Sequence, residues 1–224
     1  MIPASADLPL ALGSVPAATV FTVISGLGTL AWLLAYVLVV RRGFLDRTYG
    51  MPLAALAANI GNELIFAVVH PAEGLLRWSN FLWAAVDVVI VCQVIRYVPR
   101  ELPSLGARWS RLTVPLAIAV ATVLQLSFIA EFDDYGGAYC IFGINVMMSL
   151  CFVQMALARG DRRGQSIPIA VAKLVGTALF SLAMFFFSRD DFARGPLLTV
   201  LYVVCLVADV AYVALLRRLP AVRA

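Results

Sequence analysis

Long apolar stretches alternate along the chain with short segments that hold most of the polar and charged residues. Seven stretches reach about 18 residues or more, the length at which an apolar helix can cross the hydrocarbon core of a bilayer. They lie at residues 16–40, 51–69, 79–98, 112–130, 138–158, 167–187 and 196–216. The pattern predicts an all-α membrane protein, a bundle of seven transmembrane helices in which consecutive helices run up and down as neighbours. Residues 1–224 are expected to form a single transmembrane domain, with a first span that is not a signal peptide because no basic residue precedes it.

The composition agrees with this pattern, because 62% of the residues are hydrophobic and only 13% are charged. A soluble domain is roughly half apolar and about a quarter charged, and a globule of this size could not hide so much apolar surface from water. A soluble enzyme, a nucleic-acid-binding protein and a disordered chain are therefore excluded. The four cysteines lie within apolar stretches and are expected to be small buried side chains, not disulfides or metal ligands.

The arginines predict the orientation of the bundle, because cytoplasmic segments of membrane proteins are enriched in Lys and Arg. Thirteen fall on one side of the predicted spans: Arg41, Arg42, Arg47, Arg96, Arg100, Arg108, Arg111, Arg159, Arg162, Arg163, Arg217, Arg218 and Arg223. Three fall on the other side: Arg77, Arg189 and Arg194. The N-terminus is therefore expected outside and the C-terminus in the cytoplasm. The scarcity of lysine in a chain rich in Arg, Ala, Val and Leu is typical of a GC-rich genome, so we expect a multi-pass protein of a bacterial cytoplasmic membrane.

Four ionisable residues lie inside predicted spans, where a charge is costly and by default indicates function: Glu63, Asp87, Lys173 and Asp209. The rise of a helix places Glu63 about 9 Å and Asp87 about 12 Å from the outer ends of their spans. Asn145 and Gln125 fall in the same outer layer, at about 10 and 8 Å. Asp209 and Lys173 lie about 10 and 9 Å from the cytoplasmic ends, so they could meet each other there.

Structural interpretations of these residues stay open. Asp209 and Lys173 can form a buried ion pair with a purely structural role, or Lys173 can extend to the cytoplasmic surface. Asn59, Asn62 and Asn145 can hydrogen-bond neighbouring helices without contacting a substrate. This structural interpretation is weakest for Glu63, because no basic residue is expected at its depth. If Glu63 and Asp87 share a layer without a cation, at least one of them keeps its proton at neutral pH.

Motifs exclude several membrane chemistries. Magnesium-dependent ionisation of a prenyl diphosphate needs a site such as D-D-x-x-D, whereas the pairs Asp133-Asp134 and Asp190-Asp191 lack the third acid and are expected in solvated outer loops. No H-E-x-x-H occurs, and His70, the single histidine, is expected at a membrane interface. A retinal protein would need a lysine deep in its last helix, where this chain has an aspartate. We therefore expect no metal and no cofactor.

Three segments together resemble a known family: Ala58-Asn59-Ile60-Gly61-Asn62-Glu63, Leu82-Trp83-Ala84-Ala85-Val86-Asp87-Val88-Val89 and Asp209-Val210-Ala211-Tyr212. This set resembles the small seven-helix integral-membrane terpene cyclases of meroterpenoid and indole-terpenoid biosynthesis, which are best known from fungi and have actinobacterial relatives. The resemblance covers the whole chain in length and number of spans. This chain has Asn62 where the family commonly has Trp just before the acid.

The resemblance implies a membrane-bound, metal-independent cyclase of the class II type. Such enzymes protonate a terminal alkene or epoxide of a prenyl chain attached to an aromatic, indole or pyrone group. By resemblance, the acids on the second and last helices, Glu63 and Asp209, are the main catalytic candidates, and Asp87 matches a further acidic position. The expected partners are a lipophilic prenylated substrate, the lipid bilayer, and a prenyltransferase or epoxidase of the same pathway, but no nucleic acid.

The chemistry of protonation agrees with a buried acid. A neutral carboxyl group in a dry pocket, oriented by an amide such as Asn59 or Asn62, can protonate an alkene or epoxide. The carbocation that forms needs aromatic faces and no water. The expected substrate-binding residues are Asn59, Asn62, Phe66, Trp83, Asn145 and Tyr212. Trp78, Phe81 and Tyr202 are further aromatic candidates, although interfacial or core packing explains such residues as well.

Two other functions fit a seven-helix bundle. A small proton-coupled transporter would use the buried carboxyl groups as a proton relay, but the sequence lacks a pair of helices broken by Gly or Pro. A receptor or assembly factor would explain the bundle but not two acids without a cation.

Overall fold

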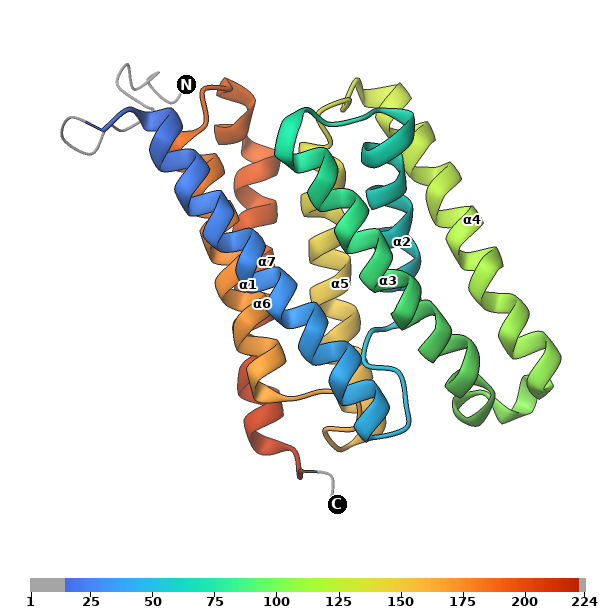
Figure 1. Cartoon of the computed structure of the whole chain (residues 1–224). Coiled ribbons are helices and arrows are strands. Elements are labelled where there is room, and N and C mark those ends of the chain that lie inside the picture. Colours follow the sequence, from blue (N-terminus) through green and yellow to red (C-terminus); the bar gives the residue numbers. More distant parts are fainter. Residues whose placement is uncertain (1–14, 222–224) are drawn as a thin grey trace.

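The computed structural model describes residues 15–221, and it confirms the predicted all-α bundle of seven helices (Figure 1). The helices are α1 (Ala17–Leu45), α2 (Leu53–Leu64), α3 (Gly74–Glu101), α4 (Gly106–Phe132), α5 (Ala138–Arg159), α6 (Ile167–Leu182) and α7 (Pro196–Arg218). A π-helical turn extends α2 over Ile65–Val69 and another extends α6 over Ala183–Phe187. Short 3-10 turns lie at Pro103–Leu105 and Asp191–Arg194. Arg223, one of the arginines used to predict orientation, lies outside the described residues.

Several helices extend beyond the predicted spans. α1 continues through Arg41 and Arg42 to Leu45, and α3 begins at Gly74 rather than near residue 79. The predicted limits follow the hydrocarbon core, whereas a helix can continue into water, where basic residues near its C-terminus interact favourably with the helix dipole. The sequence thus locates the spans better than the ends of the helices.

The second span is shorter than the other six. Within residues 15–221, six helices are long and apolar enough to cross a membrane, while Leu53–Val69, formed by α2 and its π-helical turn, has 17 residues. At about 1.5 Å per residue it extends about 26 Å, close to the thickness of the hydrocarbon core. It packs against α3, α4 and α5, and Ala55, Leu56 and Ala57 are almost fully buried. The shortest span is therefore enclosed by its neighbours, and it carries Asn59 and Glu63 into the bundle.

Consecutive helices run in opposite directions. The loops α2–α3, α4–α5 and α6–α7 lie at the end of the bundle where α1 begins, and the C-terminus of α7 lies at the opposite end (Figure 1). This is the up-and-down arrangement expected from short connections. The loops near the start of α1 belong to the side with few arginines. The orientation of the bundle in a membrane stays a prediction from those arginines.

Candidate active site

Four polar side chains from three helices meet inside the bundle: Tyr36 of α1, Asn59 and Glu63 of α2, and Asp87 of α3. We call them the acid cluster. The Asn59 Nδ2 amide donates to Glu63 Oε1 at 2.6 Å and to Asp87 Oδ2 at 2.9 Å, and it also contacts the Tyr36 hydroxyl. That hydroxyl donates to Glu63 Oε1 at 3.4 Å. Asn59 and Glu63 are four residues apart and share one face of α2, and the Asn59 amide bridges two carboxyl groups.

The acid cluster is buried without a cation. Glu63 is 4% exposed and Asp87 is fully buried, and neither forms an ion pair with any residue of the described range 15–221. The Asn59 amide holds the two carboxyl groups beside each other, and two negative charges without a cation would repel each other there. Glu63 Oε2 and Asp87 Oδ1 each lack a partner among the described residues. The arrangement favours a pair that carries at most one negative charge and holds a transferable proton.

A cavity of about 440 Å³ opens beside Glu63. Its volume lies in the range of small-molecule sites, roughly 300–1,000 Å³. Glu63, Asn59 and Tyr36 form one part of the wall, and most of the remaining wall is apolar or aromatic. Besides Tyr36, His70 and Tyr135, the aromatic side chains on the wall are Trp32, Phe66, Trp83, Phe142 and Phe180. A lipophilic chain in this cavity would lie among aromatic rings and next to an acid.

One end of the cavity lies between two loops. His70 and Glu73 come from the α2–α3 connection, and Tyr135 and Gly136 come from the α4–α5 loop. The rings of His70 and Tyr135 meet edge to face, with 5.2 Å between their centroids. The expected interfacial position of His70 therefore coincides with the mouth of the cavity. The polar side chains of these loops, together with the largely apolar wall elsewhere, suit an amphiphilic molecule.

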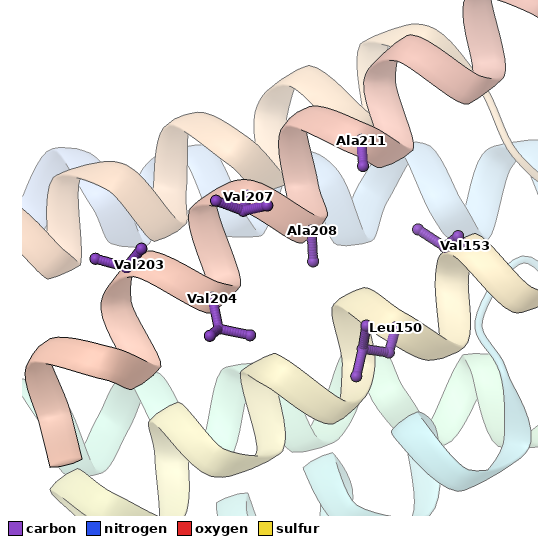
Figure 2. Close-up of a pocket in the computed structure, with 7 residues that line it drawn as sticks. All are labelled: Leu150, Val153, Val203, Val204, Val207, Ala208 and Ala211. Carbon is purple, nitrogen blue, oxygen red and sulfur yellow. The ribbon is translucent and has the colours of Figure 1, made fainter.

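A second hollow lies between α5 and α7 and has a different character (Figure 2). Figure 2 shows its seven lining side chains, which are all Leu, Val or Ala. None of them can donate or accept a proton. This hollow is therefore a groove in the apolar surface, and the chemistry points to the cavity beside Glu63.

Asp209 belongs to another polar group, on the far side of Asn145. The Lys173 ammonium of α6 donates to Asp209 Oδ1 of α7 at 2.6 Å, and both side chains are almost fully buried. It also donates to Ser149 Oγ at 2.6 Å and to Asn145 Oδ1 at 3.1 Å, both on α5. We call these four residues the lysine cluster. The expected contact between Lys173 and Asp209 is observed, and Lys173 does not extend to the cytoplasmic surface.

Six of the nine predicted site residues line the cavity: Asn59, Asn62, Glu63, Phe66, Trp83 and Asn145. The other three lie outside the lining. Asp87 is reached through Asn59, and Asp209 through Lys173 and Asn145. Tyr212 packs against Phe152 and donates to Gln165 at 3.0 Å.

The remaining aromatic candidates lie away from the cavity lining. Trp78 is 69% exposed and Phe81 is also exposed, while Tyr202 is buried and donates to the carbonyl of Ala193. Among the amides, Gln125 donates to the Ala58 carbonyl at 2.9 Å, so it ties α4 to α2 instead of joining the acids. Of the expected outer layer, Glu63 and Asp87 are joined through the Asn59 amide.

The expectation that Asp134 lies in a solvated turn is wrong. Asp134 is 7% exposed and accepts the backbone N–H of Cys140 at 2.7 Å and that of Tyr139 at 3.3 Å. Burial raises the pKa of the Asp134 carboxyl, while these N–H donors oppose the shift. The loop folds inward because the N-terminus of α5 has free N–H groups that a carboxylate can satisfy. Asp134 thereby fixes the loop that carries Tyr135 and Gly136.

Sequence reasoning missed Tyr36, Trp32 and Asn80. Tyr36 is 4% exposed and contacts Glu63, and Trp32 lies one turn earlier on α1. The only available signal was the four-residue spacing of Trp and Tyr within an apolar helix. Asn80 is 7% exposed and lines the cavity on the first turns of α3, where the predicted span had just begun.

Replacing Gly137 by Ala is expected to destabilise the fold and to disturb the cavity wall. Gly137 has φ of 73°, and a Cβ there would lie 2.4 Å from the Phe66 ring. A left-handed backbone and an overpacked contact together should cost about 2–4 kcal/mol. The unfolding midpoint of the detergent-solubilised protein measures this loss. Gly136→Ala is the matched control, because nothing lies within 4 Å of its Cβ position, and an equal loss in both variants would contradict the expectation.

The matching protein family and the similar curated proteins are all terpene cyclases. The family of Pyr4-like transmembrane terpene cyclases matches residues 10–220. The chain is 28% identical over 173 residues to terpene cyclase macJ of Penicillium terrestre, a match that covers 74% of this chain and 65% of macJ. It is 27% identical to the Pyr4-family terpene cyclase mfmH of Annulohypoxylon moriforme, with 82% of this chain and 79% of mfmH covered. It is 24% identical to terpene cyclase pyr4 of Aspergillus fumigatus, with 85% and 83% covered. The chain thus spans just under two thirds of macJ, and no solved structure matches it.

Proposed function

Because the chain belongs to the family of Pyr4-like transmembrane terpene cyclases, we propose that it cyclises a prenyl chain inside the membrane by protonation, without a metal ion. The substrate class is an aromatic, indole or pyrone compound that carries a prenyl chain, with or without a terminal epoxide. The observation that carries the proposal is the buried carboxyl group of Glu63 on the wall of a largely aromatic cavity. The helices of the bundle are apolar enough to cross a membrane, where a lipophilic substrate would partition.

The proposed reaction starts at Glu63. Its carboxyl proton passes to the epoxide oxygen or to the terminal alkene carbon, and a carbocation forms on the prenyl chain. Ring closure moves the positive charge along the chain, and the aromatic wall stabilises it. Loss of a proton from the last cation to the Glu63 carboxylate restores the acid and gives a product of unchanged mass.

Asn59 and Tyr36 would act as positioning residues. Both hydrogen-bond to Glu63 Oε1, which leaves Oε2 as the oxygen that carries and delivers the proton. Hydrogen bonds to the carboxylate that forms lower the cost of giving up the proton. Asp87 contacts Asn59 behind the cavity wall and would tune the pair. Asp209 stays a candidate for a role at the other side of the cavity.

Replacing Tyr36 by Phe is expected to lower kcat/KM for cyclisation by about 10- to 100-fold, the loss that follows removal of a hydrogen bond to a charged group. Rates of ring formation by membranes with equal amounts of folded protein measure this change. Tyr97→Phe is the matched control, because Tyr97 is buried beside Arg96 and Arg100 and does not line the cavity. A Tyr36→Phe variant as active as the Tyr97→Phe control would contradict the role of the hydroxyl.

The activity itself is tested with purified protein in lipid vesicles. A farnesylated phenol or its terminal epoxide is added in the presence of EDTA. The products are separated, and their masses are measured by mass spectrometry. We expect ring isomers of unchanged mass. A requirement for magnesium, or release of diphosphate from a prenyl diphosphate, would contradict the proposal.

We propose that the protein lies in a bacterial cytoplasmic membrane with its N-terminus outside, because few lysines and many Arg, Ala, Val and Leu residues are typical of a GC-rich genome and the arginines fall mainly on one side of the spans. The relatives compared above come from fungi. A prenyltransferase or an epoxidase of the same pathway would supply the substrate. Genes for such enzymes beside this one would support that setting.

A further inference from the structure

The lysine cluster holds a fully coordinated ammonium group. Lys173 is 1% exposed, and its Nζ has three acceptors: Asp209 Oδ1 and Ser149 Oγ at 2.6 Å, and Asn145 Oδ1 at 3.1 Å. An ammonium group has three N–H donors, whereas a neutral amine has two. The three acceptors therefore match the charged form of Lys173, balanced by an ionised Asp209.

Asn145 connects this ion pair to the cavity. Its Oδ1 accepts from Lys173, and its Nδ2 donates to Thr177 Oγ1 at 3.2 Å. The Lys173 ammonium can only donate, so turning the amide over would set its N–H groups against another donor and lose that hydrogen bond. The second N–H of Asn145 has no acceptor among the described residues, and Asn145 lines the cavity. The ion pair thus fixes a hydrogen-bond donor on the cavity wall.

Trp32 is the second contact between Lys173 and the cavity. The Lys173 Nζ lies 5.1 Å from the centroid of the Trp32 ring, which lines the cavity and meets Tyr36 edge to face at 6.2 Å. Gly176 lets the ring lie against α6, because a Cβ there would stand 2.5 Å from Trp32 Cδ1. A cation–π contact and a close-packed glycine hold the ring in one orientation.

We propose that Lys173, held by Asp209, is a positioning residue that orients Asn145 and Trp32 on the cavity wall and so determines how the prenyl chain folds before its rings close. This inference rests on the proposed cyclase function and assigns Asp209 the role of anchoring Lys173. The ion pair directs its positive end to the cavity, because Lys173 contacts the lining residues Asn145 and Trp32, whereas the hydrogen bond of Asp209 within residues 15–221 is to Lys173. The positive end of the ion pair disfavours a cation on the substrate close to Asn145, so the cation is favoured near the acid cluster.

Substitutions of Thr177 test the role of Asn145 without touching a charge or a lining residue. Thr177 is fully buried, is not part of the cavity lining, and accepts a hydrogen bond from Asn145, which is part of it. Thr177→Val removes the acceptor for the Asn145 amide at nearly constant volume, and Thr177→Ser keeps it. We expect Thr177→Val to change the ratio of ring products by about two- to tenfold, as the loss of one hydrogen bond implies. Thr177→Ser should keep the wild-type ratio. If the Val variant does not reach the membrane, Thr177→Ala replaces it.

The ratio of products distinguishes a Thr177 hydroxyl that positions Asn145 from one that only stabilises the fold. A merely structural hydroxyl would lower the amount of folded protein and leave the ratio of products unchanged. The same ratio in the wild type, the Val variant and the Ser variant would overturn the proposal. Equal shifts in the Val and Ser variants would overturn it as well.

A spectroscopic measurement tests the cluster without any substrate. Lys173 is the single lysine of the chain, so protein grown with ¹⁵N-labelled lysine gives one side-chain Nζ signal. We expect an ammonium signal at neutral pH, with through-space contacts to the Asn145 side chain that weaken in Thr177→Val and persist in Thr177→Ser. A neutral amine signal, or contacts that do not depend on Thr177, would overturn the inference. If no cyclised product forms with the wild type, the proposed function fails, and this signal then decides the inference by itself.

Discussion

Replacing Glu63 by Gln is expected to lower the rate of cyclisation by about 10²- to 10⁴-fold, the contribution that a positioned general acid usually makes. The amide has nearly the same shape but cannot deliver a proton from Oε2. Because the change also removes one of two neighbouring carboxyl groups without a cation, the unfolding midpoint should stay the same or rise. Initial rates and thermal unfolding of the purified variant in detergent or lipid measure both effects.

The matched control for this variant is Glu131→Gln. Glu131 lies exposed near the end of α4, away from the cavity, so the same chemical change there should leave the rate unchanged. A Glu63→Gln protein that is folded and keeps more than about a tenth of the wild-type rate would contradict the role of Glu63 as general acid.

Replacing Asp87 by Asn is expected to lower the rate by about 10- to 100-fold, because Asp87 acts on the substrate only through Asn59 and Glu63. Residues that act as a unit give losses that do not add. The test therefore compares the effect of Asp87→Asn in the wild type and in Glu63→Asp, whose shorter acid should retain a measurable rate.

The four proteins of this comparison form a double-mutant cycle. We expect Asp87→Asn to lower the rate less in the Glu63→Asp background than in the wild type, since the contact with Glu63 is already disturbed there. The same fold-loss in both backgrounds would mean that the two acids act independently, which would contradict a shared proton.

The number of spans was predictable because hydrophobicity over about 18 residues reports directly on the cost of crossing a bilayer. The meeting of Asn59 and Glu63 followed from helical periodicity, and that of Lys173 and Asp209 from depth and opposite charge. These features depend on one helix, or on one strong interaction between two. They need no knowledge of how all seven helices pack.

Other parts of the site depend on how each helix is rotated about its own axis. The sequence of a helix that is apolar on every side does not show which side faces the cavity. α1 is apolar on its lipid-facing and its buried sides alike, so the inward position of Tyr36 and Trp32 left no pattern. Estimates of depth placed Asn145 in the same layer as Glu63. The long side chain of Lys173 reaches along the bundle, however, and its ammonium group donates a hydrogen bond to Asn145. Depth locates a backbone position and not the end of a flexible side chain.

The central claim is that the Glu63 carboxyl holds a proton and gives it to the prenyl chain. Infrared spectroscopy of protein labelled with ¹³C-carboxyl glutamate tests this directly, because only four glutamates contribute and Glu63→Gln identifies one of them. We predict a carboxylic-acid band at neutral pH that Glu63→Gln removes, and that decreases after mixing with substrate as the first ring product forms. A wild-type spectrum with carboxylate bands alone, or a band that stays constant while product forms, would contradict the account.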